Sequence, residues 1–323
     1  MILLISRPLL LARLLIEKTA EFVAAPARAQ PLAFLRIGLA AVLFAQAVCY
    51  RNALPELYGS LGIVQAPIVE GLTPDNVPRV RLLTEALAPI GISEDGTLRG
   101  LYAAYLASLA GLAVGWRTRL LAVAACLVHL TLKYSGQLSA YGAYEFGHIG
   151  LFYCVWLPVG HAWSLDRWAG RVSGTPSADA RLGLRLLQLH LCIVYLSSGV
   201  LKASGQQWWN GEAIWRALMR PDFGQLDCAW LASAPWLAAL ACWATLFVEL
   251  GYAALIWPRC TRRAMLAAVI GMHVGIAVMM GLWAFSAVMI VLNLAALGID
   301  ATPGNGAHGS PTSSSLDSHP LRT

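Results

Sequence analysis

Runs of about twenty apolar residues recur along this chain and constrain its fold more than any other feature. The segment 235–257, PWLAALACWATLFVELGYAALIW, carries a single charged side chain, Glu249. A helix that crosses the hydrocarbon core of a bilayer needs about 20 such residues. Of the 323 residues 58% are hydrophobic and only 12% are charged, whereas a soluble domain carries about 25% charged residues. We therefore expect an integral membrane protein whose main surroundings are the lipid bilayer.

The apolar runs predict the architecture directly. Residues 31–299 are expected to form an all-α, polytopic transmembrane helix bundle of about eight spans. The third candidate is short, and the last two can be divided differently. The expected spans lie near 32–50, 98–116, 119–133, 143–160, 183–202, 235–257, 264–281 and 282–299.

The two ends of the chain differ from the bundle. Residues 1–30 contain apolar runs, and their charges recur at Arg13, Glu17 and Glu21. This four-residue spacing predicts an amphipathic helix that lies at the membrane interface. A signal peptide is the alternative, because AAPARAQ resembles a cleavage site, but arginines within the apolar run argue against it. Residues 300–323 are rich in Gly, Ser and Pro, and we expect them to be disordered.

The distribution of positive charge predicts the orientation. With the N-terminus inside, every short inner loop is net basic, as the positive-inside rule requires. We therefore expect both termini in the cytoplasm and a multi-pass protein of the bacterial inner membrane. The formal net charge of +6 then reports orientation, and we expect no nucleic-acid partner. The basic residues of the inner loops are Arg117, Arg119, Arg167, Arg171, Arg181, Arg259, Arg262 and Arg263.

Ionisable side chains within spans are costly, and they usually face the bundle or a cavity. At about 1.5 Å per residue, Glu249 lies about 12 Å and His273 about 13 Å from the same membrane face. Consecutive antiparallel helices therefore place Glu249 and His273 at one level, as a polar intramembrane pair. Such a pair can relay protons or hold a ligand, or it can simply lock two helices together. The sequence leaves these alternatives open.

Glu145 and His148 form an ExxH motif and project from one face of the fourth span. Di-iron bundles use this motif in two copies with two further carboxylates, and the chain has no second copy. We therefore expect a polar wall near the outer mouth of the bundle and no metal site. Cys49 and Cys228 both fall on the outer side, but sequence gives no distance between them, so a disulfide stays open.

Lys202 lies where an apolar run meets water, in YLSSGVLKASGQQWWNGEAIW, residues 195–215. A lysine at a helix end commonly snorkels toward the headgroups, and tryptophans commonly mark that interface. A desolvated lysine can instead lose its proton and act as a base. The spacing does not decide between these interpretations.

Four segments in order along the chain carry a family resemblance. Between Leu35 and Ile299 the chain resembles the HTTM (horizontally transferred transmembrane domain) family, which includes the membrane part of vitamin K-dependent gamma-carboxylases. The segments are LRIGLAAVLFAQAVCYRNALPELYG, YGAYEFGHIGLFYCVWLPVGHAWSLD, LQLHLCIVYLSSGVLKASGQQWWNG and VELGYAALIWPRCTRRAMLAAVIGMHVGIAVMMGLWAFSAVMI.

The resemblance implies a role for Lys202, because the shared pattern of Tyr, small residue and Gly, Lys and Trp places it on the carboxylase's base. In that family the lysine deprotonates a reduced vitamin K hydroquinone on the non-cytosolic side. Oxygen then converts the hydroquinone to an epoxide, and the strong base so formed abstracts a substrate proton before CO2 adds. His148 corresponds to a carboxylase histidine near the active site.

Two functional hypotheses follow. In the first, the protein is an enzyme that uses a reduced vitamin K-type naphthoquinone, with Lys202 and His148 as catalytic groups and Tyr195, Trp208 and Trp209 against the cofactor. In the second, it is a non-catalytic membrane protein, either a partner subunit of another membrane protein or a small-molecule carrier. A cavity holding Lys202 and a second titratable group favours the first hypothesis, and a lysine that points to the headgroups favours the second. We do not expect carboxylation of protein glutamate, because no segment resembles the large soluble domain of the eukaryotic carboxylase.

Overall fold

The computed structural model describes residues 13–303 apart from 15, 75, 137–140 and 224–225. Within these ranges the chain is helical, and its one β-type pairing is an isolated bridge between Ala27 and Ser177. Each of the eight predicted spans overlaps one long helix. These helices are α2 (Gln30–Tyr50), α6 (Glu94–Val114), α7 (Thr118–Ser135), α8 (Gly142–Trp156), α10 (Ala178–Ala203), α13 (Pro235–Leu255), α14 (Arg259–Met280) and α15 (Trp283–Asn293), which continues as a π-helix over Leu294–Gly298.

Five of these helices, α2, α6, α10, α13 and α14, are long and apolar enough to cross a membrane. The predicted all-α membrane bundle is therefore confirmed. Helix α7 has 18 residues, α8 has 15 and α15 has 11, so the count of eight spans stays a prediction.

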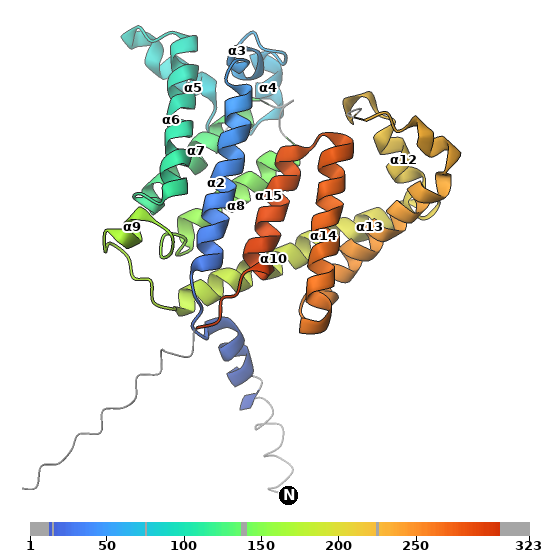
Figure 1. Cartoon of the computed structure of the whole chain (residues 1–323). Coiled ribbons are helices and arrows are strands. Elements are labelled where there is room, and N and C mark those ends of the chain that lie inside the picture. The colour runs from blue at the N-terminus through green and yellow to red at the C-terminus, as the bar shows by residue number, and fades with distance from the viewer. Residues whose placement is uncertain (1–12, 15, 75, 137–140, 224–225, 304–323) are drawn as a thin grey trace, which may run out of the picture.

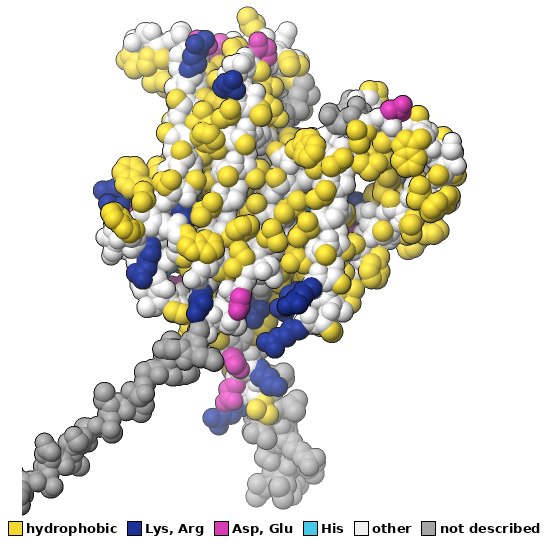
Figure 2. All heavy atoms as spheres, in the orientation of Figure 1, with side chains coloured by type: hydrophobic (Ala, Val, Ile, Leu, Met, Phe, Trp, Pro, Cys, Tyr) yellow, Lys and Arg dark blue, Asp and Glu magenta, His cyan; other side chains and the backbone are white. Residues whose placement is uncertain are grey.

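Short helices gather at one end of the bundle, which we call the distal end (Figure 1). Between α2 and α6 lie α3 (Leu54–Tyr58), α4 (Ala66–Leu72), α5 (Val80–Leu87) and η1 (Ala88–Ile90). Between α10 and α13 lie α11 (Gln206–Trp209), α12 (Glu212–Leu218), η3 (Pro221–Phe223) and η4 (Ala229–Ser233). Helix α9 (Leu165–Trp168) lies near the opposite, basal end. Figure 2 shows hydrophobic side chains over the middle of the molecule and a group of Lys and Arg side chains toward the basal end.

The core follows from helical periodicity. In α2 the leucines at 32, 35, 39 and 43 are all buried, because their spacing of three or four residues puts them on one face. Helix α15 packs against α2, α8 and α14, and α10 packs against α13. In Figure 1, α10 and α13 run inclined to α2, α14 and α15. Helix α10 has 26 residues and is about 39 Å long, so inclination lets it fit a bilayer core of about 30 Å.

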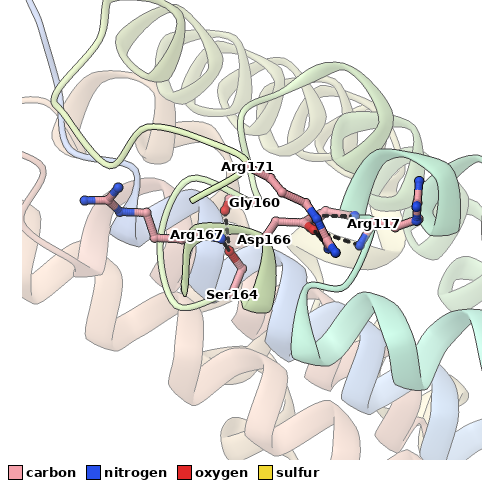
Figure 3. Close-up of polar contacts among 7 residues, drawn as sticks. Arg117, Gly160, Ser164, Asp166, Arg167 and Arg171 are labelled. Carbon is pink, nitrogen blue, oxygen red and sulfur yellow. Dashed lines mark hydrogen bonds and ion pairs between the residues drawn. The ribbon is translucent and has the colours of Figure 1, made fainter. Parts of the chain in front are cut away.

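Asp166, in α9, is bound to the start of α7 near the basal end of the bundle (Figure 3). Asp166 accepts hydrogen bonds from the backbone N–H of Arg117 at 3.0 Å and of Thr118 at 2.7 Å, and the Thr118 hydroxyl donates to it at 2.8 Å. Arg171 adds an ion pair at 3.0 Å. Burial of Asp166 opposes its ionisation, but these hydrogen bonds outweigh that effect and lower its pKa to about 2. Asp166 therefore caps α7 from a different segment of the chain.

Arg36 is a buried side chain that connects three segments of the chain near the same end of the bundle. Its side chain is fully buried in α2. It donates hydrogen bonds to the backbone carbonyl of Leu112 at 2.8 Å and to that of Trp163 at 2.5 Å. Arg36 thus ties α2 to the end of α6 and to the loop after α8.

Part of residues 1–30 is helical in the described chain, and the predicted position of this segment at the membrane interface stays a prediction. Residues 16–24 are helical, and Arg13 pairs with Glu17 at 2.9 Å. The guanidinium of Arg185 lies 3.8 Å from the Phe22 ring, and its Nε donates to the Phe22 carbonyl at 2.9 Å. This segment is thereby docked on α10. Residues 1–12 of the predicted interfacial helix and 304–323 of the predicted tail lie outside the described residues.

No disulfide joins Cys49 to Cys228 in the described chain. All seven cysteines are free, and Cys49 is exposed whereas Cys228 is buried. The two thiols therefore lie in different surroundings, and the bridge that the sequence left open does not form.

Candidate functional site

The distal half of α10 presents a row of small and polar residues to α13. Tyr195 lies three and four residues before Ser198 and Gly199, and Lys202 lies four and three residues after them, so all four residues share one face of the helix. Tyr195 and Gly199 are buried. Helices α10 and α13 are packed against each other along this face.

Lys202 turns toward α13 and forms an ion pair there. Its Nζ donates hydrogen bonds to Ser198 Oγ at 2.5 Å and to Glu249 Oε1 at 3.0 Å. Nζ also lies 2.9 Å from Glu249 Oε2, and this buried oxygen accepts no hydrogen bond from any described residue. The side chains are 26% exposed for Lys202 and 8% exposed for Glu249. A snorkelling lysine extends to the headgroups, whereas Lys202 contacts a second titratable group within the protein.

Gly199 explains how the two helices come so close. A Cβ atom at this position would lie 3.0 Å from the backbone nitrogen of Leu250 and 3.1 Å from the Cβ of Glu249. Backbone atoms cannot move aside as a flexible side chain does. Glycine at 199 therefore sets the distance across which Lys202 reaches Glu249.

Of the two predicted cofactor tryptophans, only Trp208 contacts Lys202. The ammonium lies 5.5 Å from the Trp208 ring centroid, within the range of a cation–π contact. Trp209 faces outward, and its Nε1 donates to the Ala203 carbonyl at 2.7 Å. Its own carbonyl accepts from Trp243 Nε1 at 3.0 Å. Trp209 thus fixes α11 against α10 and α13.

A second polar cluster connects four helices. The Tyr195 hydroxyl lies 2.9 Å from His273 Nε2 in α14 and accepts a hydrogen bond from Asn293 Nδ2 in α15 at 2.8 Å. Asn293 Oδ1 in turn accepts from the Tyr252 hydroxyl in α13 at 2.8 Å. The rings of Tyr195 and Tyr252 are 4.3 Å apart. His273 Nδ1 is buried and has no hydrogen-bond partner among the described residues.

Glu249 and His273 were expected to form a pair, but each contacts a different residue of α10. Both side chains are described by the structure, and no hydrogen bond or ion pair joins them. Glu249 binds Lys202, and His273 contacts Tyr195. The depth argument fixes only the level of a residue along a helix. It does not fix the direction in which the side chain points around the helix axis.

The ExxH residues lie against α7. Glu145 pairs with Lys133 at 2.7 Å. The ring of His148 stacks on His129 at 6.1 Å, and its Nδ1 lies 3.8 Å from Cys126 Sγ. Among the contacts of the described residues, none joins His148 to Lys202.

Sequence reasoning missed three members of the two clusters, Ser198, Tyr252 and Asn293. Asn293 had a usable signal, because an amide within an apolar run seeks a hydrogen bond between helices. Asn293 is not ionisable, so the rule that charged groups within spans are functional does not select it. Ser198 lies one helical turn before Lys202, a spacing at which side chains commonly interact.

Comparison with known proteins supports the resemblance seen in the sequence. A family model described as the HTTM domain matches residues 83–297. A search of curated proteins and a search of solved structures each found no match. The matched region is more than half of the 323 residues and includes Lys202, Glu249 and the Tyr195 cluster. The chain therefore belongs to the HTTM domain family.

Proposed function

We propose that this protein is a membrane-embedded acid–base enzyme in which Lys202 accepts a proton from a quinol-type substrate, with Glu249 as its partner. One observation carries the proposal. Lys202 lies at the distal end of its helix, yet it folds back onto a buried carboxylate, with Nζ 3.0 Å from Oε1 and 2.9 Å from Oε2 of Glu249. Ionisable groups that face one another within membrane helices are rare and commonly mark functional sites.

The charge balance of the pair suits proton transfer in an apolar setting. An ammonium beside a carboxylate has no net charge, and neither does a neutral amine beside a protonated carboxyl. A proton that passes from Lys202 Nζ to the nearby Glu249 Oε2 therefore brings no new charge into a region where an isolated charge is very costly. The amine produced is a base, whereas the ammonium is not.

The residues around Lys202 fit a reduced vitamin K-type naphthoquinone in part. When bound, such a quinol supplies an acidic hydroxyl and a ring that reacts with oxygen. Lys202 offers an amine for the hydroxyl proton, Trp208 offers an indole face, and the Glu249 carboxylate beside Nζ offers a proton acceptor. Tyr195 is occupied by His273 and Asn293, so its proposed role is to position α10. His148 is left out of this site, because its contacts are with α7.

The proposal includes an eight-span topology with the basal end in the cytoplasm. Arginines of the predicted inner loops lie near that end, where Arg181 also bonds the Ala25 carbonyl at 2.8 Å. Helices α7, α8 and α15, which are shorter than the other five, would cross with help from flanking residues or local thinning of the bilayer. Lys202 would then face the non-cytosolic side of a bacterial inner membrane.

The test is quinol turnover by the purified protein and matched variants. The reaction measured is quinol plus O2 giving quinone epoxide plus water, with the epoxide quantified by chromatography. We expect Lys202→Met to abolish the epoxide and Glu249→Gln to reduce it strongly. Lys133→Met is the matched control, because Lys133 is also a lysine at a distal helix end that pairs with a glutamate at 2.7 Å. We expect this control to keep its activity.

Two outcomes would overturn the base role of Lys202. One is equal activity of the Lys202 variant and the native protein, and the other is no epoxide from any folded protein. The second outcome would favour a non-catalytic partner subunit or carrier. That alternative also rests on an observation, because the ion pair joins α10 to α13 where Gly199 brings them closest. An ion pair that only stabilises the packing of α10 against α13 would need no further feature.

A further inference from the structure

A second pocket lies at the distal end, away from Lys202. It has a volume of about 270 Å³ and is formed by α3, α4 and α5 with the distal ends of α6 and α7. Sites for drug-sized ligands measure about 300–1,000 Å³, so this pocket suits a small molecule. Its walls carry two carboxylates, two guanidinium groups and two tyrosine rings, from Glu70, Glu94, Arg79, Arg81, Tyr58 and Tyr134.

The floor of this pocket is held rigidly by buried hydroxyl groups. The Tyr58 hydroxyl lies 2.8 Å from that of Tyr144. His129 Nε2 donates to the Tyr144 carbonyl at 3.0 Å, so its Nδ1 is the acceptor for the Tyr105 hydroxyl at 2.6 Å. Beneath Tyr58 only about 10 Å³ remains, which is room for one water at most. The floor is therefore a fixed surface.

The anionic wall is preorganised and lacks a cation. Glu94 Oε1 accepts from the Ser60 backbone nitrogen at 2.5 Å, and Oε2 accepts from the Ser60 hydroxyl at 2.7 Å. Among the residues that the structure describes, no Lys, Arg or His forms an ion pair with Glu94. A carboxylate fixed beside aromatic rings is suited to bind an ammonium group.

Arg81 lines the same pocket and is held in place by two neighbouring carboxylates. Arg81 forms ion pairs with Glu70 and, at 2.8 Å, with Glu85. A guanidinium has five donors, so these ion pairs fix its position without using all of its donors. Arg79 lines the pocket beside it. This part of the pocket is suited to bind an acidic group.

We propose that the distal pocket binds a small zwitterion, with its ammonium against Glu94 and its acidic group against Arg81 in α5. A free amino acid and the headgroup of a zwitterionic phospholipid share this chemistry. This pocket is not lined by Lys202 or Glu249, so the binding test and the quinol test can fail independently of each other.

The experiment measures thermal unfolding of the protein in lipid-free detergent with four probes, which are glycine, phosphoethanolamine, ethylamine and inorganic phosphate. We expect a saturable rise in melting temperature with a zwitterion, and none with ethylamine or phosphate alone. Glu94→Gln should weaken the apparent affinity at least tenfold. Asp95→Asn is the matched control, because it removes one charge from the same helical turn outside the pocket, and it should bind like the native protein.

A second variant covers the case in which Glu94→Gln fails to fold. Arg81→Met should also weaken binding tenfold, with Arg99→Met as the control on an exposed face. To separate the two sources, unfolding is repeated in nanodiscs of phosphatidylethanolamine and of phosphatidylglycerol. A response to soluble zwitterions identifies a free molecule, whereas a response only to phosphatidylethanolamine, lost in Glu94→Gln, identifies a lipid headgroup. The proposal is overturned by no response in either format, by an equal response to ethylamine or phosphate, or by unchanged affinity in both pocket variants.

Discussion

The unequal burial of Lys202 and Glu249 makes a prediction about stability that does not depend on any catalytic role. Glu249 is 8% exposed and Lys202 is 26% exposed. The lysine also has a flexible stem and a second partner in Ser198, whereas Lys202 is the one residue of the described chain that pairs with the carboxylate. Removing the lysine should therefore cost more than removing the carboxylate.

The expected sizes follow from what each change leaves behind. Lys202→Met leaves a buried carboxylate without its cation, and breaking a buried ion pair from one side costs about 3–5 kcal/mol. Glu249→Gln leaves an ammonium that keeps Ser198 and can turn toward water, so we expect a loss of about 1–2 kcal/mol. The double variant buries no unpaired charge. It should be more stable than Lys202→Met alone, because the coupling energy, about 2–3 kcal/mol, exceeds the cost of Glu249→Gln by itself.

The assay is reversible unfolding of the four proteins in mixed micelles, with the free energy of unfolding taken from each transition. Lys133→Met and Glu145→Gln provide a control cycle on a pair whose glutamate is 56% exposed. Lys133 is 12% exposed, but the Glu145 carboxylate keeps its water, so the coupling of this pair should stay below about 1 kcal/mol. The reasoning is refuted if Glu249→Gln is the more destabilising single change, or if the Lys202 cycle is additive.

Three further predictions concern other parts of the structure. Gly199→Ala should destabilise the protein by about 1–3 kcal/mol through overpacking. Gly271→Ala in α14 is the control and should not destabilise it, because there is open space around the new methyl group. Thermal unfolding of both variants checks this prediction. Asp166 has a pKa lowered from 3.8 to about 2, so the stability it contributes is present above about pH 4 and is lost as the pH falls toward 2. We expect this loss to be about 1–2 kcal/mol, because water near the basal end weakens the effect, and to be missing from the pH profile of Asp166→Asn. The exposed thiols of Cys49 and Cys260 lie at opposite ends of the bundle. In single-cysteine variants, a membrane-impermeant maleimide should label Cys49 on intact cells and Cys260 only after lysis. The reverse labelling pattern would show the opposite orientation in the membrane.

Much of the fold could be predicted, because apolar length and charge placement are properties of single segments. Helix boundaries were less accurate where a local signal competed with the apolar pattern. The fourth span was predicted to reach residue 160, but α8 ends at Trp156, since Pro158 disfavours helix at the residue before it. The fifth was predicted to start at 183, but α10 starts at Ala178, where the Ser177 hydroxyl accepts from the Ala180 backbone at 3.2 Å.

The site was harder to predict, because it depends on how helices are turned toward one another. Lys202 and Glu249 could each be named as candidates from the sequence, because both are ionisable residues within apolar runs. Their contact could not be derived, since it joins residues 47 positions apart and depends on the close approach at Gly199. Depth along each helix suggested His273 as the partner of Glu249. The direction in which each side chain points around its helix axis cannot be derived from periodicity, because periodicity does not relate the rotation of one helix to that of the next. In the structure Glu249 points to Lys202 and His273 points to Tyr195.

The position of α15 has a consequence for how the protein is made. This helix packs against α2, α8 and α14, and its Asn293 completes the cluster around Tyr195. The helices that it joins are synthesised earlier. Until translation has passed residue 298, Tyr195 and Tyr252 lack their amide partner, and the faces of α2 and α14 that α15 covers stay uncovered. Biogenesis of the bundle is therefore completed from its C-terminal side, and a ribosome that stalls before α15 would leave an inserted but unclosed intermediate for membrane quality control.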